Sequence, residues 1–174
     1  MMQTQPIQSI TISDLTRRAA VNRVTFYLHY QDKFDLLVSV ARDTFTQMVN
    51  SKVSNWPAFQ IGDIRLLAVA TCEYFEGFLR GCAPTNKVFE PLIEAEVQRV
   101  LYDYIYCWLQ QSGVADDGSQ PIEMVAVVIS ASILNMSLRW NRGESTLTVT
   151  DIAEQVYQVT TQGILNLLPE LQPG

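Results

Sequence analysis

Apolar residues recur every three or four positions in five long segments of this chain, which is the spacing of one face of an α-helix. The segments run from Phe34 to Val53, Ile61 to Leu79, Leu92 to Leu109, Ile122 to Trp140 and Ile152 to Leu168. Strict alternation of apolar and polar residues, which predicts strands, is nearly absent. The sequence therefore predicts an all-α fold, and its 174 residues are enough to bury a sizeable core.

Two of these segments carry additional signals. Residues 122–140 are apolar on almost every side, which predicts a buried helix with no solvated face. Pro121 precedes them, at a position where a first-turn proline opens a helix. Thr148 followed by Asp151 matches a capping box for the last helix.

The N-terminal part of the chain is organised in shorter elements. Thr11-Ile12-Ser13-Asp14 is a capping-box pattern that opens a helix from Ser13 to Ala19. Asn22 can cap a second helix from Arg23 to about His29, and Asp32 can cap the long helix that follows. Two short helices joined by about three residues and followed by a long helix have the outline of a helix-turn-helix.

Charge is distributed unevenly along the chain. The formal net charge of −6 argues against a general nucleic-acid coat protein. Between Ile10 and Lys33, however, four Lys and Arg residues stand against two acids, so this stretch carries +2 and the remainder carries −8. The composition is therefore compatible with a small DNA-contacting region on an acidic body.

Residues 10–37, ITISDLTRRAAVNRVTFYLHYQDKFDLL, resemble the DNA-binding segment of the tetracycline-repressor (TetR/AcrR) family of bacterial transcriptional regulators. The matching features are ITISDL, the A-x-V-N-R turn, T-F-Y-x-H-Y in the second helix, and D-K-F-D-L-L at the start of the next. The helical, acidic remainder is similar in layout but not in motif. The resemblance implies an N-terminal helix-turn-helix head followed by a helical bundle that binds an effector and dimerises.

The resemblance also implies contacts with the DNA backbone. Tyr27 and His29 would touch phosphates, and Thr25 would lie against a phosphate or a base methyl group. Lys33 would hold a phosphate at the start of the long helix, and Ser13 would add a further backbone contact.

Arg23 is the base-contacting residue that the resemblance implies, since Arg is well suited to bidentate contact with guanine. Ala20 departs from the family, which usually has Gly or Asn there, and a left-handed conformation would cost Ala roughly 1–2 kcal/mol. Val24 stands where Gly, Ala or Ser is more common. The family's first helix precedes the ITISDL stretch, where this chain has only MMQTQPIQS, so we expect a head that lacks most of that helix.

Aromatic residues of the middle helices indicate either core or a pocket for an effector. Ligand pockets are largely apolar with a few oriented polar groups. Tyr74, Tyr106 and Asn135 are the candidate ligand-binding residues, with core or surface packing as the alternative for each. The sequence leaves open whether the effector is a small molecule or a protein.

Small residues on the last two helices permit close approach of another helix. They are Ser130, Ala131, Ser132 and Gly163. Paired across a two-fold axis, the two helices would form a four-helix bundle between two chains. The resemblance implies the same homodimer, because two heads contact one palindromic operator; an ordinary core within one chain is the alternative.

The sequence contains little that would indicate a catalytic site or a metal site. His29 is the only histidine, and the three cysteines are far apart, which favours reduced thiols over a disulfide framework or a zinc site. Glu90, Glu94 and Glu96 lie near one another on one predicted helix, but without catalytic partners we interpret them as a solvated face. We expect no enzyme activity, no cofactor and no metal.

The sequence thus predicts two parts: a helix-turn-helix DNA-binding domain at 1–45 and an effector-binding and dimerisation domain at 46–174. The expected function is transcriptional regulation, most often repression in this family, through a double-stranded DNA operator. The start MMQTQPIQS has no signal-peptide pattern, and the apolar run between Glu123 and Arg139 is short for a membrane span, so we expect a cytoplasmic protein. The alternative is a helical ligand- or protein-binding module with a defective head.

Overall fold

Each helix predicted from the apolar spacing is present in the structure, a computed structural model that describes residues 6–53, 60–81, 89–112 and 122–167. Over these ranges the chain forms α-helices and two short 3-10 turns, and no strand. The prediction of an all-α fold is therefore confirmed. The predicted bounds differ from the observed ones by a few residues at each end.

Two 3-10 turns and a series of α-helices are the secondary-structure elements of the described residues. A 3-10 turn, Ile7–Ser9, comes first, and a second, Ile61–Asp63, leads into the fourth helix. The helices are α1 (Ile12–Ala19), α2 (Arg23–His29), α3 (Lys33–Lys52), α4 (Ile64–Gly81), α5 (Glu90–Gln111), α6 (Ile122–Asn141) and α7 (Val149–Leu167).

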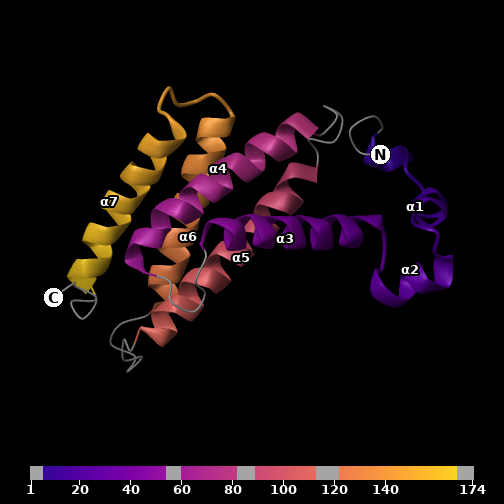
Figure 1. Cartoon of the computed structure of the whole chain (residues 1–174), viewed down its shortest axis with the longest axis horizontal. Coiled ribbons are helices and arrows are strands. Elements are labelled where there is room, and N and C mark those ends of the chain that lie inside the picture. Colours follow the sequence, from indigo (N-terminus) through magenta and orange to yellow (C-terminus); the bar gives the residue numbers. More distant parts are fainter. Residues whose placement is uncertain (1–5, 54–59, 82–88, 113–121, 168–174) are drawn as a thin grey trace.

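The long helices form a bundle, and the two short ones stand apart from it (Figure 1). Helix α6 packs against α4, α5 and α7, while α3 packs against α4 and α5. The N-terminal end of α3 extends beyond the bundle and ends next to α2, so α1 and α2 lie at one end of the molecule and α7 at the other. Helix α3 is thus the connection between the two parts.

Side-chain caps begin these helices where the sequence predicts them. Thr11 and Asp14 form the reciprocal capping box of α1, and the Asn22 carboxamide oxygen accepts the Thr25 N–H at 2.7 Å. The Asp32 carboxylate accepts two backbone N–H groups at the start of α3. Asp151 and Thr148 cap α7 in the same reciprocal way. Pro121, the predicted opening of α6, lies outside the described residues.

The prediction that α6 is buried on every side is wrong. Its inner face is buried, but Met124, Val127 and Val128 are 63%, 48% and 56% exposed. Within the described ranges, α6 is the one helix long and apolar enough to cross a membrane, and half of that stretch is buried in the bundle. The apolar pattern therefore reflects an inner core face and an outer apolar face of the same helix.

Candidate nucleic-acid interface

Helices α1 and α2, with the turn Ala20–Asn22 between them, form a small unit that we call the α1–α2 unit. Ala20 adopts the left-handed conformation, with φ of 56°, and its N–H bonds back to the Arg17 carbonyl oxygen. The following N–H, of Val21, donates to the Thr16 carbonyl oxygen at 3.0 Å. This conformation ends α1 within one residue and turns the chain into α2.

Buried side chains lie in the α1–α2 unit and just before it. Phe26 of α2 and Thr16 of α1 are buried, as is Ile10 just before α1. The Phe26 ring meets the Tyr27 ring edge-on at 5.5 Å and lies 5.6 Å from the Tyr30 ring. Phe26 is therefore the inward anchor of α2, and the residues opposite to it on the helix point outward.

Five of the six predicted DNA-contact residues are on this unit, and some of them are already bonded within the chain. Arg23, Tyr27 and His29 are exposed, and Ser13 and Thr25 are half-buried. The Arg23 guanidinium donates to the Ser13 hydroxyl oxygen, which joins the start of α2 to the start of α1. The Thr25 hydroxyl donates to the Asn22 carboxamide oxygen at 3.1 Å.

Lys33, the sixth predicted contact, is turned toward the chain itself. Its Nζ donates to the carbonyl oxygens of Gln8 at 2.8 Å and Ile10 at 3.0 Å. These bonds tie the first turn of α3 to the segment that leads into α1. A shallow apolar pocket of about 110 Å³ opens beside this contact, with Leu15 and Leu36 in its wall.

Asp14, the one acidic residue of the α1–α2 unit, is bonded to local partners. Asp14 accepts from the Thr11 hydroxyl and backbone N–H and lies 2.5 Å from Arg17. The hydrogen bonds from Thr11, with the nearby Arg17, hold the pKa of Asp14 below its usual value. Arg18 is exposed and forms no ion pair within the described residues. The unit therefore presents positive charge that its own acids do not fully balance.

Contacts along α3 join this end of the molecule to the bundle. The Phe34 ring stacks on the Phe89 ring at 5.0 Å. Farther along α3, Asn50 accepts a hydrogen bond from the Tyr104 hydroxyl at 2.6 Å, and Lys52 lies 2.8 Å from Glu73. Side chains of α4 and α5 thus hold α3 over much of its length.

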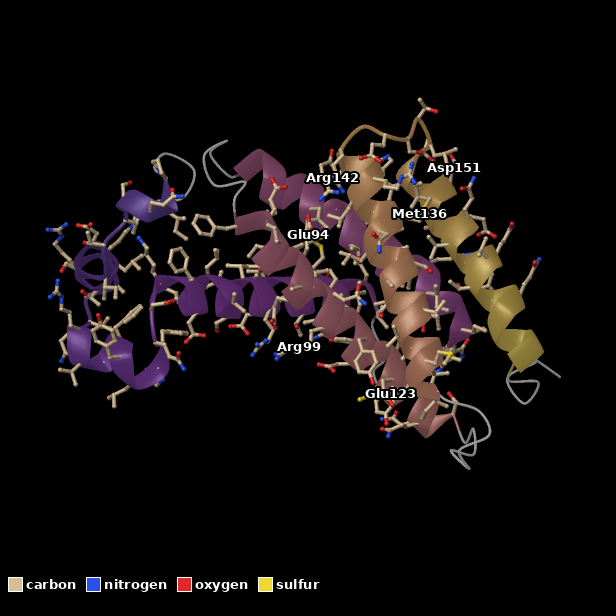
Figure 2. The ribbon with its side chains drawn as sticks, turned by 180° about the vertical axis from the view of Figure 1, so that it is seen from behind. Glu94, Arg99, Glu123, Met136, Arg142 and Asp151 are labelled. Atoms are coloured by element: carbon tan, nitrogen blue, oxygen red, sulfur yellow. The ribbon has the colours of Figure 1, made fainter. Side chains whose placement is uncertain are left out.

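The interpretation of the α5 carboxylates as a solvated face is wrong for Glu96. Glu96 is only 7% exposed and forms an ion pair with Arg42 of α3. Glu94 is half-buried and bonds Arg142 at 2.7 Å; Figure 2 labels Glu94 on α5 and Arg142 at the end of α6. A buried carboxylate needs a cationic partner, and nothing in the local sequence identifies one that is 54 residues away.

The three candidate ligand-binding residues lie in different surroundings. Tyr74 is buried between α4 and α3, where its hydroxyl donates to the Ala41 carbonyl oxygen at 3.2 Å. Tyr106 stacks on Tyr102 along α5, with ring centres 5.5 Å apart. Asn135 is on the exposed face of α6. They do not form one pocket.

Asn135 instead lines a groove of about 410 Å³ between α6 and α7. Met136, labelled in Figure 2, lies on the side of α6 toward α7 and forms part of its wall. The other lining residues are Ala131, Ser132, Gln155, Val156, Val159 and Thr160. Val159 is 74% exposed, so the groove continues the apolar outer face of α6 onto α7. Sequence reasoning identified the small residues here but not Gln155, Val159 or Thr160.

Two of the small residues predicted to lie between the last two helices of paired chains, Ser130 and Gly163, differ in their surroundings. Ser130 is fully buried and accepts a hydrogen bond from Gln98 of α5 at 2.8 Å, so it faces the core of its own chain. Gly163 is exposed, and a side chain there would meet no atom within 4 Å.

Within the described residues, no cluster of three metal-ligating side chains is present. Cys72 is buried beside Ser137, and burial raises the pKa of its thiol.

Comparison with known proteins gives no match: neither a family model, nor a curated protein, nor a solved structure matches the chain.

Proposed function

We propose that this protein is a cytoplasmic, DNA-binding transcriptional regulator that acts as a homodimer under the control of an effector. The α1–α2 unit is its helix-turn-helix, with α2 as the recognition helix in the major groove. The resemblance of residues 10–37 to the tetracycline-repressor family supports this assignment, and in that family such regulators are most often repressors.

The observation that carries the proposal is the left-handed turn at Ala20. A non-glycine residue at positive φ is costly, and it persists where the surrounding structure requires it. Here it sets α2 against α1 with Phe26 inward, which leaves α2 as an outward-facing helix at the end of the molecule. A helix presented in this way, on a unit with surplus positive charge, fits the major groove of DNA.

The proposed dimer forms through α6 and α7. Their outer face exposes Met124, Val127, Val128 and Val159, a larger apolar area than isolated surface residues provide. A second copy related by a two-fold axis would cover this face with its own α6 and α7. Two heads in one dimer can contact half-sites about 34–36 Å apart on DNA.

Effector control would act through α3. This helix carries the α1–α2 unit at one end and is bonded to α5 and α4 along its length. An effector in the bundle that binds one orientation of α3 more tightly would change the distance between the two heads. The effector is a small molecule or a protein of unknown identity.

Selection of duplexes from a random-sequence DNA pool by the full-length chain tests the proposal. We expect enrichment of a palindromic site whose affinity falls as salt rises. Arg18→Gln should lower the affinity and reduce the salt slope by about one, since it removes one phosphate-contacting charge. Arg99→Gln, which removes an exposed charge of α5 outside the proposed dimer face, is the matched control and should leave binding unchanged.

The same selection distinguishes the second candidate function. A helical ligand- or protein-binding module with a defective head would enrich no sequence, and Arg18→Gln would behave like Arg99→Gln. The groove between α6 and α7 favours this candidate if it holds a partner other than a second copy.

A further inference from the structure

Val24 and Leu28 on α2 are two strongly exposed apolar side chains in the α1–α2 unit, at 69% and 75%. Both are two residues from Phe26, the buried anchor of the helix. Two residues correspond to about 200° of rotation around an α-helix, so both side chains point away from the core. They are also one turn apart, which places them on the same outward face.

Two polar side chains that flank this face, Arg23 and Thr25, are held by intrachain bonds. Arg23 donates to Ser13, and Thr25 donates to Asn22. The outermost part of α2 is therefore hydrocarbon, contributed by Val24 and Leu28, with the half-exposed Tyr27 ring next to it. Arg23, the base-contacting residue expected from the sequence, is occupied elsewhere in this structure.

Hydrocarbon has one specific partner among the base edges of the major groove, the C5-methyl group of thymine. We propose that Val24 and Leu28 contact thymine methyl groups and so specify thymine at two positions of each half-site. This inference rests on the proposed function and names the bases that the same interface recognises. It gives Val24, which departs from the smaller residues of the similar family, a role in specificity.

The spacing of the two side chains sets the spacing of the thymines. Residues one turn apart on a helix are about 6 Å apart along its axis, from a rise of about 1.5 Å per residue. Successive bases of one strand rise by about 3.4 Å, so two steps span nearly the same length. For a helix aligned with the groove, the two thymines should therefore be about two base pairs apart.

Charge favours DNA over a protein as the occupant of this face. The stretch from Ile10 to Lys33 carries +2 on a chain with a net charge of −6. Arg17 and Arg18 end α1, on the same small unit. A basic surround with an apolar centre matches phosphates on either side of a groove and methyl groups on its floor.

Replacement of thymine by deoxyuracil in the selected duplex tests the inference, because it removes the methyl group and keeps every hydrogen-bonding group. The dissociation constant of the full-length chain is measured for each single replacement. We expect roughly a fourfold loss of affinity at two thymines of each half-site, the effect of one methyl group leaving an apolar contact.

Variants assign the two thymines to side chains. In Leu28→Ala, replacement of thymine by deoxyuracil should weaken binding less than about twofold at one of the two positions, because the side chain that contacts the methyl group is already gone. In Val24→Ala, the same reduced effect should appear at the other position. Both positions are exposed and Ala is the strongest helix former, so both variants should keep their fold. Leu66→Ala, an exposed leucine of α4, is the control and should keep both fourfold effects.

The outcomes separate this inference from the proposed function. If a duplex is selected but deoxyuracil has no effect, or the effect is unchanged in Leu28→Ala and Val24→Ala, the methyl contacts are absent and only the inference is overturned. Such a result, together with an unaltered affinity of both variants, would place this face outside the DNA interface. If no duplex is selected, the proposed function is overturned and the inference with it.

Discussion

The guanidinium of Arg42 on α3 forms an ion pair with the carboxylate of Glu96 on α5. Arg99, one turn farther along α5, lies 3.1 Å from the same carboxylate. Glu96 has 8% of its side chain exposed, whereas Arg42 and Arg99 have 42% and 53% exposed. The hydrogen bond that Arg42 donates to the Glu96 carboxylate raises the pKa of Arg42. The pair thus fixes one side of α3 to the bundle through a carboxylate that water barely reaches.

Removal of this carboxylate should cost more stability than removal of the outer arginine. Glu96→Ala should lower the free energy of unfolding by about 2 kcal/mol, since it removes charged hydrogen bonds in a buried position. Arg99→Ala should cost less than about 1 kcal/mol, because its exposed charge is well solvated. Urea denaturation of both variants measures the difference. Equal losses would mean that Glu96 does not hold α3.

The left-handed conformation of Ala20 predicts an unusual stabilising substitution. Ala20→Gly should raise the free energy of unfolding by about 0.5–1 kcal/mol, since glycine adopts φ of 56° without steric cost but has a more flexible unfolded state. Ala19→Gly, at the last residue of α1, is the adjacent control and should destabilise by about 0.5–1 kcal/mol. Thermal unfolding followed by circular dichroism compares them. A loss of stability in Ala20→Gly would contradict the observed turn.

The capping box of α7 predicts a pH effect that can be measured at one atom. Hydrogen bonds from the Thr148 hydroxyl and backbone N–H lower the pKa of Asp151 from its usual value of 3.8. A carboxylate with a lowered pKa stabilises the fold above that usual value, and this stabilisation is lost as the pH falls through the lowered pKa. In Thr148→Ala, an NMR titration of the Asp151 carboxyl carbon should show its pKa moving back toward 3.8. An unchanged titration would mean that Thr148 does not bond Asp151 in solution.

The exposed apolar face of α6 predicts the assembly state. Val128→Asp places a charge in the proposed dimer interface and should convert the dimer to a monomer in sedimentation equilibrium, with unchanged helix content. Leu92→Asp, at an exposed leucine in the first turn of α5, is the matched control and should remain dimeric. A Val128→Asp protein that sediments like the unaltered chain would place the interface elsewhere.

Local sequence signals predicted the elements of this fold well. The caps Thr11, Asn22 and Asp32 act within three residues of their own position, so their bonds are encoded where they form. Periodic apolar spacing places α3 within a residue of the predicted bounds, because one face of a long helix must be buried.

Local sequence patterns do not predict contacts between residues that are far apart in the chain. The burial of Glu96 depends on Arg42, which another helix brings to it, and Lys33 bonds carbonyl groups of Gln8 and Ile10 that only the folded chain places nearby. The pattern of α6 could not distinguish a face buried within the chain from an apolar face left outside, since both consist of the same residue types. Which side chains remain free to bind a partner therefore depends on contacts between distant elements, and the positions of the helices alone do not predict them.

Direct titrations of two duplexes test whether the protein binds DNA in a sequence-specific way. The dissociation constant of the full-length chain is measured by fluorescence anisotropy for the selected duplex and for a scrambled duplex of the same composition, over a series of salt concentrations. We expect the selected duplex to bind at least about a thousandfold more tightly and both affinities to fall as salt rises. Equal affinities for the two duplexes, or no binding to either, would mean that the protein does not recognise a DNA sequence.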